Sequence, residues 1–316
     1  MESKSIEIVP YDADWPRLFE HEAAAIKEQL DDNCVEIHHV GSTAVLGLSA
    51  KSIIDMVLVA KNPSKAICLL ESLGYVYEGE LNIPFRFYFN KKSTIEFHLH
   101  VYSPDSPEIE LNLLFRNFLR SHPNACNEYA DLKRTLAEEQ KVYKDIRPML
   151  SHYTLGKNIF IRNILQQAGF DRLRLMHCTH YAEWEAAKIF RQKYFFDKVP
   201  IADPYTWTFE HKDHVHFVLY KGVEIVGYVH LQYWPEKRVA MRIIVIDENF
   251  RGQGFGGHLL GLCEKWLRLH GFKSIHIQTS PESYNFYKKN AYAEMPFDDP
   301  DEHAVYHQDI DMGKLL

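Results

Sequence analysis

The sequence lacks any apolar run long enough to cross a membrane, and its N-terminus has no basic segment followed by an apolar one. A membrane-spanning helix needs about 18 or more apolar residues, so we expect neither a membrane partner nor a secretory signal. Cysteine is also scarce. The five cysteines lie far apart with no Cys-x-x-Cys pair, a pattern typical of reduced thiols in the cytoplasm.

A basic excess is missing as well. The chain has 36 Lys and Arg residues against 43 Asp and Glu residues, which gives a net charge of −7. Acidic residues outnumber basic ones in both halves. Residues 1–170 contain 18 basic and 23 acidic residues, and the rest of the chain contains 18 basic and 20 acidic residues. A nucleic-acid-binding domain usually carries a clear basic excess, so no nucleic-acid partner is expected. The length of 316 residues favours two domains.

The first half predicts a mixed sheet with helices. The patterns indicate strands at residues 6–9, 35–40, 53–59, 85–89 and 94–102, the last two forming a hairpin, and helices at 15–30 and 65–73. Asp14 is a candidate N-cap for the first helix. Residues 110–167 are expected to be helical, with breaks near Pro123 and Pro148. The boundary between the two halves is placed at residues 166–171.

The second half alternates strands and helices. Strands are indicated at residues 173–178, 214–220, 224–233, 239–246 and 274–279, and helices at 181–196, about 257–270 and 281–290. The predicted fold class is therefore α/β (α+β), with two mixed-sheet domains at residues 1–168 and 171–316.

A glycine-rich loop joins a strand to a helix in the second half. Gly252, Gly254 and Gly256, with Arg251 beside them, let the backbone approach a ligand and turn several N–H groups toward it. The positive end of the following helix adds to the attraction for a phosphate. A helix start that is simply rich in glycine is the alternative. A dinucleotide fold fits poorly, because a long turn separates strand and loop and no acidic residue closes a later strand at the expected spacing.

The second half resembles the GNAT superfamily of N-acetyltransferases. The resemblance rests on Ile243-Ile244-Val245 before Asn249-Phe250-Arg251, on the Arg-x-x-Gly-x-Gly loop, on the segment from Asn285 to Tyr292, and on the terminal residues 312–316. It implies an acetyl-CoA cofactor and a small-molecule or peptide amine as acceptor. It also implies that the backbone of Ile243, Ile244 and Val245 pairs with the pantetheine arm, and that Asn285 lies near the cofactor.

The resemblance further implies that loop amides hold the pyrophosphate, those of Arg251, Gly252, Gln253, Gly254, Phe255 and Gly256. Tyr287 would be the general acid, since a phenol is protonated at neutral pH and can return a proton to a thiolate. The base that deprotonates the amine stays open among Glu224, His216, His230 and water. A non-catalytic acyl-CoA sensor is the alternative to an enzyme.

The first half contains a small turn that is followed by an aspartate in an apolar strand. Gly41 and Ser42 form a small turn, and Asp55 follows in an apolar strand. Nucleotidyltransferases hold a triphosphate and a magnesium ion with such a pair. Two-metal chemistry needs a second carboxylate two residues on, where this chain has Val57. The pattern therefore supports ligand binding better than nucleotidyl transfer.

Alternating polar residues mark one later strand. Glu96, His98 and His100 share a face, and His38 and His39 precede the Gly-Ser turn. Imidazole and carboxylate groups suit a transition metal, so Asp55, Glu96, His98 and His100 are candidate ligands of a divalent metal. A cleft wall of hydrogen-bonded histidines is the alternative. The cations Arg116, Arg120, Lys133 and Lys157 are candidate anion contacts or parts of a solvated helix face.

The first half resembles the GrpB-like proteins, whose fold is that of the nucleotidyltransferases. The matching motifs are Pro10-Tyr11-Asp12, residues 39–45, Leu48-Ser49-Ala50-Lys51, residues 98–101 and Tyr153-Thr154 with Lys157. The candidate ligand site of this half comprises Gly41, Ser42, Lys51, Asp55, Glu96, His98 and His100. A bifunctional chain follows, in which this domain binds a nucleotide or another phosphorylated ligand. A binding or assembly module that presents substrates is the alternative.

Overall fold

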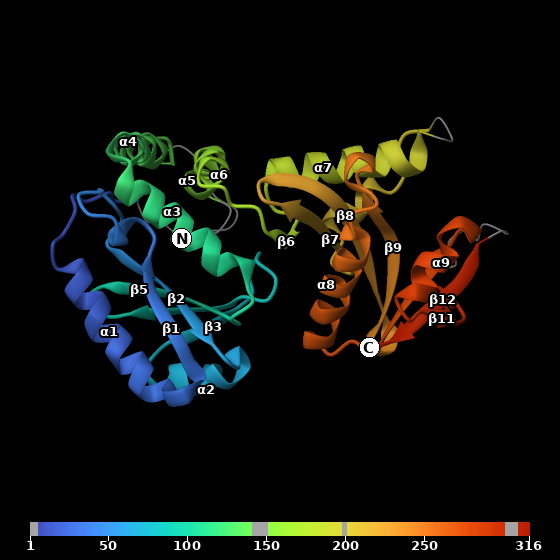
Figure 1. Cartoon of the computed structure of the whole chain (residues 1–316), viewed down its shortest axis with the longest axis horizontal. Coiled ribbons are helices and arrows are strands. Elements are labelled where there is room, and N and C mark those ends of the chain that lie inside the picture. Colours follow the sequence, from blue (N-terminus) through green and yellow to red (C-terminus); the bar gives the residue numbers. More distant parts are fainter. Residues whose placement is uncertain (1–5, 141–150, 198–200, 301–308) are drawn as a thin grey trace. The chain divides into compact units, whose positions relative to one another are not determined.

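The computed structural model describes residues 6–140, 151–197, 201–300 and 309–316. The chain divides into two compact units, Met1–Leu173 and Arg174–Leu316, and each is described by itself (Figure 1). Both units contain a mixed sheet with helices, which confirms the predicted α/β (α+β) class. Within the described ranges, no helix combines the length and the apolar character that a membrane span requires.

The first unit is built on a five-stranded sheet of order β1-β2-β5-β4-β3. Its elements are α1 Trp15–Leu30, β1 Cys34–Val40, β2 Ile53–Ala60, α2 Ala66–Ser72, β3 Val76–Gly79, β4 Phe87–Lys92, β5 Glu96–Tyr102, α3 Pro107–Ser121, α4 Pro123–Gln140, α5 His152–Gly156 and α6 Asn158–Gln167. Strands β2 and β5 run parallel, and the other neighbours run antiparallel. Strand β3 was not predicted from the sequence.

The two faces of this sheet have different roles. Alternate side chains of β2, such as Ile54 and Met56, enter the core with Trp15 and Phe19 of α1. The intervening Val57 packs with Ile109 of α3 on the opposite face. Asp55 lies on that same face because successive strand residues alternate. The apolar face therefore supports the sheet, while the other face carries its polar residues under the later helices.

The first unit contains some of the elements predicted for the first half and lacks others. The helix at residues 15–30 is confirmed with Asp14 at its N-cap position, but the Asp14 side chain accepts hydrogen bonds from Arg17 and makes no capping bond. The strand predicted at residues 6–9 is wrong, since Val9 forms only an isolated bridge with Ala50. The hairpin forms, with β4 and β5 antiparallel. The break expected near Pro148 lies outside the described residues.

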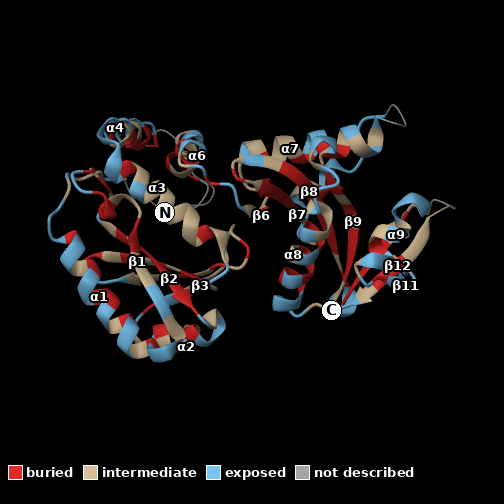
Figure 2. Cartoon of the chain, in the orientation of Figure 1, coloured by how far each residue is buried: buried red, intermediate tan, exposed pale blue. Residues whose placement is uncertain are grey.

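The second unit contains a seven-stranded sheet of order β11-β12-β10-β9-β8-β7-β6. Its elements are β6 Leu173–His177, α7 Tyr181–Arg191, β7 His214–Lys221, β8 Glu224–Trp234, β9 Arg238–Ile246, α8 Phe255–Leu269, β10 Ser274–Thr279, α9 Pro281–Lys289, β11 Ala293–Glu294 and β12 Ile310–Leu315. The central strands are buried and the outer helix faces exposed, as Figure 2 shows. The helix predicted at residues 181–196 is α-helical only to Arg191 and continues as a π-helix, Gln192–Phe196.

Candidate functional site

Strands β9 and β10 of the second unit run parallel but separate after a short contact. Their ladder extends only from Arg238↔Ser274 to Ala240↔His276. In the described part of the chain, β9 beyond Ala240 pairs with β8 alone. The backbone N–H and C=O groups of residues 243–245 that point away from β8 are therefore open to an extended ligand. Ile243, Ile244 and Val245, predicted to contact the pantetheine arm, lie in this segment.

The glycine loop lies at the end of this open strand. Gly252 and Gly254 have φ of 76° and 82°, which favour glycine, and no atom within 4 Å would meet a Cβ there. Gly254 is the N-cap of α8 without a side-chain cap, so first-turn N–H groups are free to meet an anion. A Cβ on Gly256 would lie 3.3 Å from the Phe286 ring of α9, so this glycine lets the two helices approach. The residues present fit the pyrophosphate of acetyl-CoA.

Polar contacts hold the segment that precedes the loop. Nε of Arg251 donates to the Ile246 carbonyl at 3.0 Å, and its guanidinium lies 4.9 Å from the centre of the Tyr194 ring. The Tyr194 hydroxyl donates to Asp247 at 3.1 Å and accepts from the Glu248 N–H at 3.0 Å. The side chain of Arg251 therefore supports the backbone of this segment. The groups that the loop presents to an anion are mainly its backbone N–H groups, and not the guanidinium of Arg251.

Tyr287 and Asn285 both lie on α9, which follows β10. The Tyr287 side chain is buried, and burial raises the pKa of its phenol above the ordinary value. Its ring contacts Phe286 and Tyr292, and its hydroxyl forms no hydrogen bond within the described residues. Asn285 is exposed. A protonated phenol without a protein acceptor is suited to donating a proton to a ligand atom.

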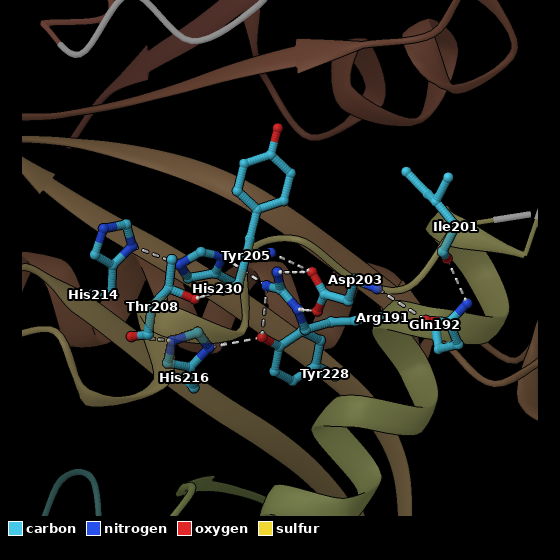
Figure 3. Close-up of polar contacts among 10 residues, drawn as sticks. All are labelled: Arg191, Gln192, Ile201, Asp203, Tyr205, Thr208, His214, His216, Tyr228 and His230. Atoms are coloured by element: carbon cyan, nitrogen blue, oxygen red, sulfur yellow. Dashed lines mark hydrogen bonds and ion pairs between the residues drawn. The ribbon is translucent and has the colours of Figure 1, made fainter. Parts of the chain in front are cut away.

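A buried polar network covers one face of β7 and β8, and sequence reasoning missed most of it (Figure 3). Arg191, at the end of α7, binds Asp203 through two hydrogen bonds of 2.5 and 3.0 Å. Its Nη1 also contacts the Tyr228 hydroxyl at 3.5 Å and Nδ1 of His230 at 3.2 Å. Arg191 and Asp203 stand twelve residues apart in the sequence, so no local sequence pattern reveals the pair.

The network accounts for His216 and His230, two of the candidate bases. His216 contacts the Thr208 carbonyl at 3.1 Å and the Tyr228 hydroxyl at 2.7 Å. His230 lies between Arg191 and Nδ1 of His214, which is 2.8 Å away. Burial lowers the pKa of His216 to about 3 and holds that of His230 well below its ordinary value. Both rings have both nitrogens engaged. Glu224, the third candidate, is exposed at the start of β8.

In the first unit, Asp55 contacts a histidine. Nδ1 of His98 lies 3.5 Å from Asp55, and Nε2 lies 3.3 Å from Glu96. Burial alone would raise the pKa of Asp55, but the His98 hydrogen bond and nearby positive charges lower it. Burial would likewise lower the pKa of His98, and the two carboxylates raise it instead. A Cβ on Gly41 would overlap the Asp55 carboxylate, so only glycine allows this turn to approach β2 so closely.

The other candidate metal ligands do not join Asp55. His100 is half-buried, and its Nδ1 lies 3.4 Å from Arg86; loss of contact with solvent, then the charge of Arg86, lowers the pKa of His100 to about 3. His39 lies on the opposite face of the sheet, stacked on Phe19. Among the described residues no group of three or more His, Cys, Asp or Glu side chains is arranged to hold a metal ion. The metal hypothesis for Asp55, Glu96, His98 and His100 is therefore corrected to a hydrogen-bonded polar wall.

Three of the candidate cations of the first unit bind backbone carbonyls of distant segments, although Arg120 is exposed on its helix. Arg116 donates to the His39 carbonyl at 2.8 Å, and Arg120 donates twice to the Ala44 carbonyl, at 2.9 and 2.7 Å. These bonds hold the segment around the Gly-Ser turn. Lys133 is almost completely buried and donates to the Ser49 carbonyl. No sequence pattern links these helices to the turn, because their contacts are with backbone groups far away along the chain.

Two family models match the chain. The model described as GrpB protein matches residues 5–167, just over half of the chain, and the one described as Acetyltransferase (GNAT) family matches residues 178–292. The chain therefore belongs to the GrpB family through its first half, and its second half contains a GNAT acetyltransferase domain. Both family resemblances noted in the sequence are confirmed.

Two curated relatives match the first half. The UPF0157 protein YqkA of Bacillus subtilis is 33% identical over 169 residues, covering 52% of this chain and 48% of YqkA. The UPF0157 protein BH1888 of Halalkalibacterium halodurans is 33% identical over 168 residues, covering 52% of this chain and 83% of the relative. The chain thus spans about half the length of YqkA.

Two solved structures are also similar, each over one half of the chain. The crystal structure of GrpB from Enterococcus faecalis is 34% identical in sequence and has a TM-score of 0.46. The match covers 51% of this chain and 96% of the Enterococcus faecalis chain. A GNAT-family acetyltransferase from Staphylococcus aureus is 15% identical, covers 46% of this chain and 99% of its own, and has a TM-score of 0.37.

Proposed function

We propose that the second unit is an acetyl-CoA-dependent N-acetyltransferase that acts on an amine of a small molecule or peptide. The observation that carries this proposal is the separation of β9 from β10 beyond Ala240, directly before the glycine loop at the start of α8. An open strand edge suits the amides of a pantetheine arm, and the helix N-terminus suits a pyrophosphate.

In this proposal different residues of the chain bind the cofactor and transfer a proton. The backbone of residues 243–245 binds the arm, and the amides of residues 251–256 bind the phosphates. When bound, acetyl-CoA supplies a thioester that the amine attacks. Tyr287 donates the proton that the sulfur takes up as the C–S bond breaks. Asn285 lies two residues before Tyr287 and contacts the cofactor. The proton of the amine passes to water or to a group outside the buried histidine network.

Substitution of Tyr287 by Phe tests the catalytic role and separates it from a sensor function. We expect kcat for acetyl transfer to fall about 10²- to 10⁴-fold, while the dissociation constant of acetyl-CoA stays within a factor of about three. The parent protein is first screened against polyamines, aminoglycosides and peptide N-termini. Acetyl-CoA binding without acetylation of any amine would instead support the sensor.

We propose further that the first unit binds a nucleotide or another phosphorylated ligand, through the turn at Gly41 and Ser42 with Lys51 and Asp55. The basic groups around that turn support this proposal, and the absent second carboxylate at Val57 argues against nucleotidyl transfer. A thermal-unfolding series of the full chain with ATP and magnesium tests it, because a bound ligand raises the midpoint. No shift with any phosphorylated compound would favour an assembly module.

The separated cysteines favour a cytoplasmic setting for both activities.

A further inference from the structure

Three lysines of the first unit surround two tyrosine rings near Asp55. Lys51 precedes β2, Lys133 lies on α4, and Lys157 lies between α5 and α6. The ammonium groups of Lys51 and Lys157 lie 5.4 and 4.6 Å from the centre of the Tyr153 ring. That of Lys133 lies 4.8 Å from the centre of the Tyr129 ring. Residues from three separate segments thus bring three positive charges to one place.

These charges have no direct ion-pair partner within the described residues. In the part of the chain that the structure describes, none of the three lysines forms an ion pair. Burial, and then repulsion from a neighbouring lysine, lowers the pKa of Lys133 to about 7 and that of Lys157 to about 8. Asp55 is the carboxylate that opposes both shifts, and it is already hydrogen-bonded to His98. A buried ammonium with spare donors is costly unless an anion joins it.

Hydroxyl groups complete the surroundings. Ser42 places a hydroxyl beside that of Tyr129, next to the ring that Lys133 covers. The turn that carries Ser42 is fixed through Arg120 and the Ala44 carbonyl. Cations and hydroxyl donors converge here, while Asp55 is turned toward His98 and Gly41. Such a set resembles the donors that hold a phosphate group as an anion, with ammonium groups as point charges.

We propose that Lys51, Lys133 and Lys157 bind a phosphate group of a small phosphorylated compound directly, without a divalent cation between them. This inference rests on the proposed ligand-binding function of the first unit and specifies its chemistry. The three ammonium groups neutralise the anion, and the anion in turn relieves their mutual repulsion. The first unit is then a receptor for a phosphorylated metabolite, in which no bond is made or broken.

Titration calorimetry on the full chain with inorganic pyrophosphate in EDTA tests the proposal. Three single substitutions, Lys51→Met, Lys133→Met and Lys157→Met, each remove one charge and leave an unbranched side chain of similar length. Each is expected to weaken pyrophosphate binding at least about tenfold, the loss typical of one charge-assisted hydrogen bond. Lys61→Met is the matched control, because Lys61 is an exposed lysine of the same unit outside the cluster.

Thermal unfolding separates binding from folding. Replacing a buried, unpaired ammonium with an apolar group should keep or raise the unfolding midpoint, so Lys133→Met should lose ligand without losing stability. Equal affinities for Lys157→Met, Lys51→Met and Lys61→Met would overturn the proposal. Binding that EDTA abolishes and magnesium restores would also overturn it while leaving the proposed function intact. If neither pyrophosphate nor magnesium-ATP binds, both proposals fail.

Discussion

Arg191 donates a hydrogen bond from Nη1 to Nδ1 of His230, 3.2 Å away, and so fixes the protonation of that ring. A guanidinium can only donate, so Nδ1 must accept. The proton of the neutral ring is then on Nε2, which donates to His214. By the same reasoning, the Thr208 carbonyl can only accept, so His216 is protonated on Nε2 and accepts from Tyr228. Neither ring has a free lone pair for an incoming amine.

The first prediction is that His230 supports structure and does not act as the general base. In His230→Gln, a partner of Arg191 is disturbed in a buried site, so the free energy of unfolding should fall by about 1–3 kcal/mol. The apparent pKa on the acid limb of the kcat/KM profile should stay at its wild-type value. Chemical denaturation and a pH–rate series measure the two effects. Loss of the acid limb in a variant that is still folded would assign the base to His230.

The second prediction concerns charge at the start of α8. Gly254 has a left-handed φ of 82°, a conformation that Asp and Asn tolerate better than other side chains, and it precedes an uncapped helix. Gly254→Asp places a carboxylate where the phosphates are proposed to bind, so acetyl-CoA affinity should fall at least about tenfold. Gly254→Asn has nearly the same shape without the charge and is the matched control. Similar calorimetric affinities for the two variants would contradict phosphate binding at this turn.

The third prediction is a pH dependence. Burial raises the pKa of Tyr287, so the phenol stays protonated from neutral pH to beyond the ordinary tyrosine value of about 10. An acid that is protonated throughout cannot produce an alkaline fall in rate over that range. Between pH 8 and 10, titration of Tyr287 should therefore cause no fall in the kcat of the parent protein. Any fall in kcat over this range should also be present in Tyr287→Phe. A fall near pH 9 that is present in the parent and absent in the variant would contradict the assigned role.

Local patterns were sufficient for most of the fold. The amphipathic spacing of residues 15–30 and the apolar run at β2 gave the correct elements, because a helix and a buried strand are each encoded by neighbouring residues. Residues 6–9 alternate like a strand, but Val9 finds only one bridging partner, Ala50. Whether a strand forms depends on a neighbour that the local pattern does not show.

The sites were predicted less completely, for a related reason. The glycine loop and Tyr287 belong to short motifs and could be recognised in order along the chain. The grouping of Lys51 with Lys133 and Lys157 depends on three segments folding onto the same tyrosine rings. The alternation of Glu96, His98 and His100 correctly predicted a shared face, but it could not show that His98 contacts Asp55. Contacts between distant segments set the chemistry of these groups.

The fourth prediction tests the close approach of Gly41 to Asp55. Gly41→Ala forces a side chain into a φ of 69° and into the Asp55 carboxylate, so unfolding should require at least about 1–2 kcal/mol less free energy. Asp55→Ala removes the overlap but not the backbone strain. The double variant should therefore be more stable than the sum of the two single losses predicts, by about 0.5–3 kcal/mol. Additive losses in urea denaturation would show that the turn can move away from β2.

The last prediction follows the charge of the lysine cluster with pH. Lys133 is influenced by Lys157, Asp55, Cys126 and Arg134, and Lys157 by Lys51 and Asp55. The pKa of Lys133 is about 7 and that of Lys157 about 8, so both side chains carry a positive charge below pH 7. As the pH rises, Lys133 loses its charge first and Lys157 second. An anion binds the charged forms, so affinity should be highest at low pH and fall through pH 7 to 9. The fall should be about tenfold per pH unit for each proton taken up on binding.

Sulfate is the probe for this experiment, because its charge does not change over the range and the ligand's own titration cannot account for a slope. Calorimetry in two buffers with different ionisation enthalpies counts the protons directly. Proton uptake near pH 7.5 that is reduced in both Lys133→Met and Lys157→Met is the expected result. Affinity that does not change with pH would mean that both lysines remain charged throughout, and that another anion of the chain already offsets their burial.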